Sequence, residues 1–135
     1  MNTANIQFTL QDIYELHAQL ESAFVLSPGV RDENLLASAV YTPFQTFMGN
    51  DLYPSIYDKA AQLCYGLANN HPFTDGNKRT ALHSMYVYLI INGFDITATQ
   101  QDVENMIIEI AAGNMTNTEL AQWLRENTVE IDTNL

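Results

Sequence analysis

Residues 71–79 read His-Pro-Phe-Thr-Asp-Gly-Asn-Lys-Arg, and residues 80–91 continue as Thr-Ala-Leu-His-Ser-Met-Tyr-Val-Tyr-Leu-Ile-Ile. The second segment is largely apolar and is spaced like a buried helix, so we expect a helix that begins at Asn77. The first backbone N–H groups of a helix have no partner within it and coincide with the positive end of its dipole. Such a helix start is a binding site for anions, and His71 and Asp75 stand at its rim.

Capping signals predict further helices on both sides of this one. A Ser, Thr or Asp residue precedes each helical pattern, in several cases with an acidic residue three positions later. The expected helices run from Thr9 to about Ser22, from Asp32 through Val40, from Ser55 to Asn69 or Asn70, from Asn77 to Asn92, from Thr99 to near Gly113, and from Thr116 to about Asn127. We therefore expect an all-α, compact six-helix bundle. It would be a single domain over residues 1–135, with its core at about 8–127 and a frayed acidic tail at 128–135.

Residues 42–54, which precede the third helix, do not fit a helical pattern. They contain two prolines, a Gly-Asn-Asp run and several aromatic or apolar side chains. Long irregular connections are uncommon in a compact domain and are usually functional when they occur. We therefore expect an irregular, apolar flap at this point in the chain.

The charge balance excludes one class of partner. The chain has 16 acidic and five basic residues, with a net charge of −11, and five cations are too few to build a nucleic-acid surface. Two of the five, Lys78 and Arg79, are adjacent at the predicted anion site. A single cysteine is typical of a reducing compartment, and no apolar run reaches the length of a membrane span. We expect a cytoplasmic protein without direct nucleic-acid or membrane contacts.

Two side chains of the 71–79 segment can carry chemistry. Imidazole exchanges protons near neutral pH, so His71 can take a proton from a hydroxyl and later release it. A carboxylate such as Asp75 beside a phosphate site can hold Mg²⁺, whose other ligands are then waters and phosphate oxygens. The structural alternative is that His71 only caps the preceding helix. A permanent zinc site is not expected, because no other His, Cys or Glu stands at a ligand spacing, and His17 and His83 are expected to be structural or to face solvent.

The other residues of the segment suit an anion. Gly76 permits close backbone approach, and Asn77 can cap the helix or donate its amide to a phosphate oxygen. Lys78 supplies a point charge, and Arg79 supplies a planar fork for bidentate contact. Phe73 lies between polar positions and is expected to point into the core and pin the loop.

This segment resembles the signature of the Fic-domain family, His-x-Phe-x-Asp/Glu-Gly-Asn-Gly/Lys-Arg, and it is most similar to the Doc (death-on-curing) branch, the toxins of Phd–Doc toxin–antitoxin pairs. The resemblance extends to the six-helix plan, the chain length, the stretch from Val30 to Leu36 and the Asn92-Gly93 pair, and so covers most of residues 8–127. It implies the transfer of part of ATP to a hydroxyl of a target protein.

By this resemblance His71 is the general base, Asp75 binds Mg²⁺, and residues 76–79 (Gly76, Asn77, Lys78 and Arg79) form the anion hole. Residues 43–54 become a flap that docks the target segment, with Phe44, Phe47 and Tyr53 as its contact residues. The expected co-substrate is ATP, and the expected cofactor is Mg²⁺.

Two positions depart from the pattern of AMP-transferring Fic proteins. Lys78 stands in place of a glycine, and Leu82 stands in place of a second arginine. In Doc toxins these changes accompany an inverted nucleotide, whose γ-phosphate faces the attacking hydroxyl. The resemblance therefore favours a protein kinase that modifies a Ser or Thr of elongation factor Tu and arrests translation. AMP transfer to a protein hydroxyl and a catalytically silent binding module are the alternatives.

The sequence also bears on regulation. Self-inhibiting Fic proteins carry Ser/Thr-x-x-x-Glu followed by Gly or Asn. The three Glu-Asn pairs of this chain, at residues 33, 104 and 126, have Gly or Gln four positions before the glutamate. Restraint is therefore expected from a separate Phd-like antitoxin, which would lay a segment along an apolar groove and carry Lys or Arg against the acidic chain.

Overall fold

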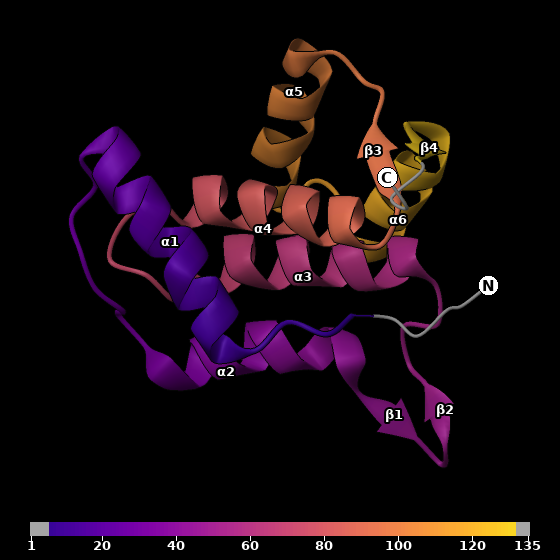
Figure 1. Ribbon diagram of the computed structural model, residues 1–135, viewed down its shortest axis with the longest axis horizontal. Coiled ribbons are helices and arrows are strands. Elements are labelled where there is room, and N and C mark those ends of the chain that lie inside the picture. Colours follow the sequence, from indigo (N-terminus) through magenta and orange to yellow (C-terminus); the bar gives the residue numbers. More distant parts are fainter. Residues whose placement is uncertain (1–5, 132–135) are drawn as a thin grey trace.

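The computed structural model describes residues 6–131, which form six α-helices, one 3-10 helix and two small two-stranded sheets (Figure 1). The elements are α1 (Leu10–Phe24), α2 (Glu33–Tyr41), the 3-10 helix η1 (Thr42–Phe44), β1 (Thr46–Phe47), β2 (Asn50–Asp51), α3 (Ile56–Asn70), α4 (Asn77–Ile91), β3 (Phe94–Ile96), α5 (Gln100–Ala111), α6 (Asn117–Glu126) and β4 (Thr128–Glu130). The predicted all-α fold is confirmed. Helices α1, α2, α3, α5 and α6 begin directly after their predicted Ser, Thr or Asp caps, and α4 begins at Asn77 as expected. Each helix ends close to the expected residue.

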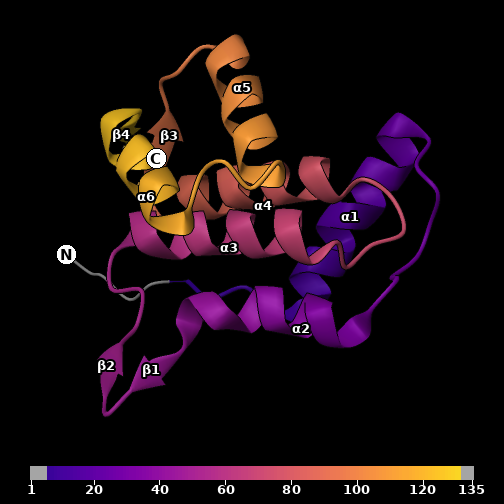
Figure 2. The ribbon, with the colours of Figure 1, turned by 180° about the vertical axis from the view of Figure 1, so that it is seen from behind.

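Helix α3 lies at the centre of the molecule. It packs on α2, α4 and α6, while α1 lies across α4 (Figures 1 and 2). Gly66 allows a close crossing with α2, because a Cβ at this residue would lie 3.2 Å from the Cα of Ala39. Cys64 is fully buried in α3, and burial raises the pKa of its thiol to about 12, so it is an inert part of the core.

The C-terminal segment is not frayed over the described residues. Thr128–Glu130 form β4, which pairs antiparallel with β3, and the N–H of Ile131 donates to the carbonyl oxygen of Gly93 at 2.8 Å. The prediction of a tail frayed from residue 128 was wrong here, because pairing with a distant strand satisfies these backbone groups. Residues 132–135, the rest of the predicted tail, lie outside the described residues.

The flap, residues 43–54, is more regular than expected. Strands β1 and β2 pair antiparallel through a two-residue turn at Met48 and Gly49, whose φ angles are 51° and 83°. Positive φ at both turn residues gives the twist that a tight hairpin requires. The flap is therefore a short hairpin, and it projects from the end of the molecule at which α3 begins (Figure 1).

Candidate active site

Residues 71–76 form the loop that joins α3 to α4, and both of its ends have left-handed backbone conformations. His71 ends α3 with φ 49° and ψ 53°, and Gly76 precedes α4 with φ 76°. These turns let α4 run back along α3 (Figure 1). His71, Asp75 and the start of α4 consequently belong to a single loop at one end of this helix pair.

His71 is exposed, and Arg31 holds its main chain. The Nε of Arg31 donates to the carbonyl oxygen of His71 at 2.7 Å, and Nη2 donates to that of Asn70 at 3.0 Å. The guanidinium of Arg31 thus donates to carbonyls at the end of α3, and its positive charge interacts favourably with the negative end of the helix dipole. The sequence did not reveal this role, because Arg31 lies 40 residues before His71 in the chain. The imidazole itself is left facing solvent, where an external hydroxyl can reach it.

Asp75 is half-buried and is held from three directions. Its Oδ1 accepts from the N–H of Gly76 at 2.8 Å, and its Oδ2 accepts from the N–H of Ser27 at 3.0 Å. Its carbonyl oxygen lies 2.9 Å from Nε2 of His17. A carboxylate has about four lone-pair sites, so each oxygen of Asp75 can still accept a second contact. The orientation of this carboxylate is fixed before any ligand arrives.

The start of α4 differs from the prediction in one respect. Gly76, rather than Asn77, is the N-terminal cap, and among residues 6–131 no side chain caps this helix start. The side chain of Asn77 instead braces the loop, because its Oδ1 accepts from the N–H of Phe73 at 2.9 Å and its Nδ2 donates to the carbonyl oxygen of Phe73 at 3.0 Å. Within the described part of the chain, no side chain occupies the backbone N–H groups at the start of α4, so these groups are available to an anion.

Lys78 and Arg79 are both exposed on the first turn of α4. The guanidinium carbon of Arg79 lies 4.0 Å from the centroid of the Phe24 ring. A cation–π contact uses the face of the guanidinium and leaves its N–H edges free for a bidentate ligand. Leu82, one turn later, is half-buried and lies with Arg79 along the same groove, so it adds apolar surface there.

The φ angle of 76° favours glycine at residue 76, and a larger residue there would also displace the side chain of Leu26. A Cβ on Gly76 would lie 2.4 Å from Cδ1 of Leu26. Leu26 belongs to residues 25–31 of the α1–α2 connection, and these residues lie beside the loop. The N–H of Thr74 donates to the carbonyl oxygen of Gly29 at 3.1 Å, and the N–H of Arg31 donates to that of Pro72 at 2.7 Å. Residues 25–31 therefore form one wall of the site.

Phe73, expected to point inward, is 1% exposed, and its ring stacks on His17 with centroids 3.8 Å apart and an interplanar angle of 5°. His17 is buried on α1, which fits the structural alternative given for it. Its contacts with this loop were not apparent from the sequence, because the two segments are far apart in the chain.

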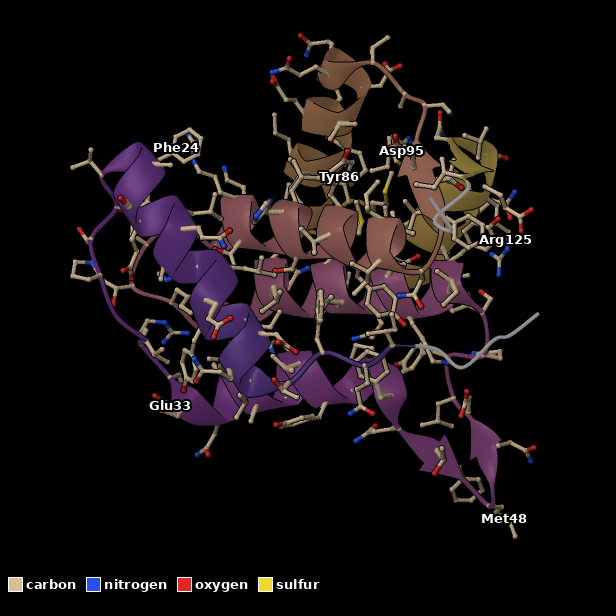
Figure 3. All side chains as sticks on the ribbon, viewed as in Figure 1. Phe24, Glu33, Met48, Tyr86, Asp95 and Arg125 are labelled. Carbon is tan, nitrogen blue, oxygen red and sulfur yellow. The ribbon has the colours of Figure 1, made fainter. Side chains whose placement is uncertain are left out.

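The structure does not bring the flap to this loop. The flap precedes α3 and His71 ends it, and α3 has 15 residues, a length of about 22 Å. Figure 3 shows Met48 at the flap tip and Phe24, which neighbours Arg79, at opposite ends of the molecule. Phe47 is exposed, whereas Phe44 packs on Tyr88 and Tyr53 is half-buried. The segment that actually borders His71 is 25–31, so the docking role predicted for the flap receives no support from its position.

The flap is anchored by a buried cation. Lys59 of α3 donates from Nζ to Oδ2 of Asp51 at 3.0 Å and also to the carbonyl oxygen of Tyr53. The side chain of Lys59 is 4% exposed, whereas that of Asp51 is 44% exposed. Removal of Asp51 would therefore leave a buried ammonium, whereas removal of Lys59 would leave a carboxylate in contact with water.

We expect Asp51→Ala to cost more stability than Lys59→Met. Removal of Asp51 leaves a buried ammonium with one carbonyl partner, which should lower the free energy of unfolding by about 1–3 kcal/mol. Removal of the charge on Lys59 leaves an aspartate that water can solvate, and the methionine keeps the apolar contacts. Urea unfolding of the two variants measures the difference, and a larger loss for Lys59→Met would contradict this assignment.

A groove of about 650 Å³ adjoins the start of α4. It is largely apolar and lies between α1, α4 and the β3–α5 segment, and its lining includes Leu20, Phe24, Arg79, Leu82, Tyr86 and Ile96. His83 also lines this groove, and burial lowers its pKa, which favours the neutral imidazole. Figure 3 labels Phe24, Tyr86 and Asp95 along it.

Among residues 6–131, no helix has both the length and the apolar character needed to cross a membrane.

Sequence comparison places this loop in a known context. A model of the Fic/DOC family matches residues 7–89, which include the whole of the 71–79 segment and most of α4. The chain belongs to the Fic/DOC family. Within that family, two similar curated proteins are named as Doc proteins, which confirms the resemblance to the Doc branch.

The first relative, Toxin Doc of Mycolicibacterium smegmatis, is 49% identical over 69 residues, which is 51% of this chain and 53% of that protein. The second, Protein kinase doc of Escherichia phage P1, is 25% identical over 115 residues, which is 85% of this chain and 90% of that protein. The match to the first relative spans only about half of its length. The two names describe those proteins, and the activity of this member of the Fic/DOC family is a separate question.

Proposed function

We propose that this chain is a Doc-like toxin that transfers the γ-phosphate of ATP to a Ser or Thr hydroxyl of elongation factor Tu in the cytoplasm and thereby arrests translation. The single observation that carries the proposal is the uncapped start of α4, with Lys78 and Arg79 on its first turn and with Asp75 and His71 in the loop before it. Phosphoryl transfer depends chiefly on positioning and on stabilising phosphate charge, which are the tasks such a site can perform.

The donor set fits a magnesium ion that is shared with a nucleotide. Among residues 6–131, no three His, Cys, Asp or Glu side chains gather into a metal site. Mg²⁺ commonly uses one or two carboxylates and takes its other ligands from phosphates and water. Asp75, held by Ser27 and Gly76 with lone pairs to spare, would hold the ion at the phosphates. When bound, the ion neutralises charge on the β- and γ-phosphates.

The remaining roles follow from position. His71 would accept the proton of the target hydroxyl while the hydroxyl oxygen forms its bond to the γ-phosphorus. The bond from that phosphorus to the β–γ bridging oxygen breaks, and ADP leaves. The N–H groups of residues 77–79, with the edges of the Arg79 guanidinium, would bind the phosphate oxygens. Asn77 would contribute through its backbone, because its amide is engaged with Phe73.

Lys78 and Leu82 favour γ-phosphate transfer over AMP transfer. Lys78 is exposed on the first turn of α4, and its side chain would occupy space that a glycine would leave for phosphates along the helix. Leu82 presents an apolar side chain where a second arginine would clamp them. Both features work against a nucleotide that runs along α4 with its α-phosphate at the hydroxyl. The name of the phage P1 relative, a protein kinase, agrees with this preference.

We expect the double variant Lys78→Gly/Leu82→Arg to change the transferred group. Loss of the charged contact between the Lys78 ammonium and a phosphate should lower γ-phosphate transfer about tenfold or more. The freed space and the new arginine should permit measurable AMP transfer. Initial rates with ATP labelled at the γ or the α position give the ratio of the two reactions, and the single variants divide the effect between the two positions. An unchanged ratio would show that these residues do not set nucleotide orientation.

Two ATP analogues test the proposed function in translation. Elongation factor Tu is incubated with the protein and nucleotide, recovered, and added to a cell-free system that lacks this factor. Arrest is expected with ATP and with the analogue that carries a methylene between the α- and β-phosphates. In this analogue the bond from the γ-phosphorus to the β–γ bridging oxygen can still break. The analogue with a methylene between the β- and γ-phosphates should be inert. The reverse pattern indicates AMP transfer, and normal translation with all three indicates a binding module.

A Phd-like antitoxin is the partner we propose for the groove beside α4. The groove is largely apolar, which suits the apolar face of a helical segment, and its lining includes Arg79 and Leu82 on the first turns of α4. An occupant would therefore cover the approach to the phosphates. Since the chain carries a net charge of −11, a basic segment is expected to associate faster and more selectively than a neutral one.

A further inference from the structure

His17 on α1 makes three contacts that bear on the active-site loop. Its Nε2 lies 2.9 Å from the carbonyl oxygen of Asp75, and its Nδ1 lies 3.0 Å from Oε2 of Glu21. Its ring stacks on Phe73 at 3.8 Å. The residue is 3% exposed, so these contacts form away from water, where each one constrains the loop strongly. Packing against Phe73 explains why an aromatic ring stands here, but it does not explain the polar contacts of the two ring nitrogens.

The contacts of His17 belong to a closed set of hydrogen bonds around Asp75. Oε2 of Glu21 also accepts from the N–H of Gly29 at 3.1 Å, which ties the 25–31 segment to α1. That segment reaches Asp75 through Ser27, whose N–H donates to Oδ2. His17 thus holds the carbonyl of Asp75 directly. The carboxylate of Asp75 is held by Ser27, whose segment is tied to α1 by Glu21.

We propose that His17 is a positioning residue for the magnesium ligand: its Nε2 fixes the main chain of Asp75 so that the carboxylate stays directed toward the nucleotide phosphates. This inference rests on the proposed function. The partners that orient a ligand are commonly nearly as important as the ligand, and their loss typically weakens metal binding by about 10–100-fold.

Three substitutions separate this role from packing. The amide of His17→Gln can occupy the place of Nε2 and restore the donor to Asp75. The amide of His17→Asn is shorter by one methylene and can occupy the place of Nδ1, so it keeps the contact to Glu21 alone. His17→Phe keeps the stacking on Phe73 and loses both nitrogens. All three are made in a His71→Ala background, so that ATP is bound but not consumed.

The readout is the affinity for ATP by isothermal titration calorimetry, with and without Mg²⁺. In the His71→Ala parent and in His17→Gln, Mg²⁺ should strengthen ATP binding to a similar extent. In His17→Asn and His17→Phe that gain should shrink about tenfold or more, while the affinity without Mg²⁺ stays the same and shows that the site is folded. If His17→Phe does not fold, the Gln and Asn variants carry the comparison.

Two results would overturn the inference. If Mg²⁺ strengthens ATP binding equally in the Gln and Asn variants, or fully in His17→Phe, then His17 only packs, and the proposed function is untouched. If Mg²⁺ has no effect on ATP binding even in the His71→Ala parent, the positioning role and the proposed magnesium-dependent function fail together.

Discussion

Replacement of His71 by alanine is expected to lower phosphoryl transfer by about 10²–10⁴-fold, which is the usual contribution of general-base assistance. The imidazole is exposed at the end of α3, and Arg31 holds only the main chain of the residue. Truncation of the side chain should therefore leave the loop, the fold and ATP binding intact. Transfer of label from γ-labelled ATP to the target, measured at saturating ATP, reports the loss.

A second variant separates the loss of the base from an effect on the backbone. His71 has φ 49°, and asparagine accepts this left-handed conformation better than most residues. His71→Asn should therefore match the parent chain in urea unfolding and still lose transfer as fully as His71→Ala. If either variant retains transfer within a few-fold of the parent, His71 acts only as a helix cap.

Asp75→Asn is expected to lower transfer by two or more powers of ten and to remove its dependence on Mg²⁺. The ion is worth several kcal/mol of charge stabilisation, and each 1.36 kcal/mol is tenfold in rate. An asparagine has a single side-chain oxygen, so it can accept from the N–H of Gly76 or from that of Ser27, and its NH2 group then faces the other N–H. The measurement is the rate of transfer across a range of Mg²⁺ concentrations.

The matched control for this change is Asp102→Asn. Asp102 lies in the exposed first turn of α5, so the substitution alters the net charge equally without reaching the loop. It should leave both the rate and the Mg²⁺ dependence of transfer unchanged. Equal losses in the two variants would mean that net charge, and not a metal ligand, explains the effect of Asp75.

The helices could be predicted because their signals are local. The capping boxes of Thr9 with Asp12, Ser55 with Asp58 and Thr116 with Glu119 are all present in the structure, each within a span of four residues. The start of α4 at Asn77 was also predicted. The choice of Gly76 as the cap was not, because the amide of Asn77 is taken by Phe73, a contact that depends on how the whole loop closes.

Features that depend on distant partners could not be predicted. Strand β4 forms only because β3 supplies the other half of its ladder, more than 30 residues earlier in the chain. Arg31 and His17 reach the loop from segments that the sequence places far from it. The flap was predicted as a segment, but its distance from His71 follows from the direction in which α3 runs, which no local pattern encodes. The sequence thus predicted which residues of the 71–79 loop lie together, whereas the distant side chains that hold this loop in place could not be predicted.

The central claim is that the loop and the start of α4 present the γ-phosphate of ATP to a protein hydroxyl. The most direct measurement uses purified protein, elongation factor Tu and ATP labelled at either the γ or the α position, with Mg²⁺. We predict that label from the γ position appears on the factor, that label from the α position does not, and that His71→Ala lowers the transfer by about 10²–10⁴-fold. Label from the α position, or no label from either together with unchanged toxicity of His71→Ala in cells, would contradict it.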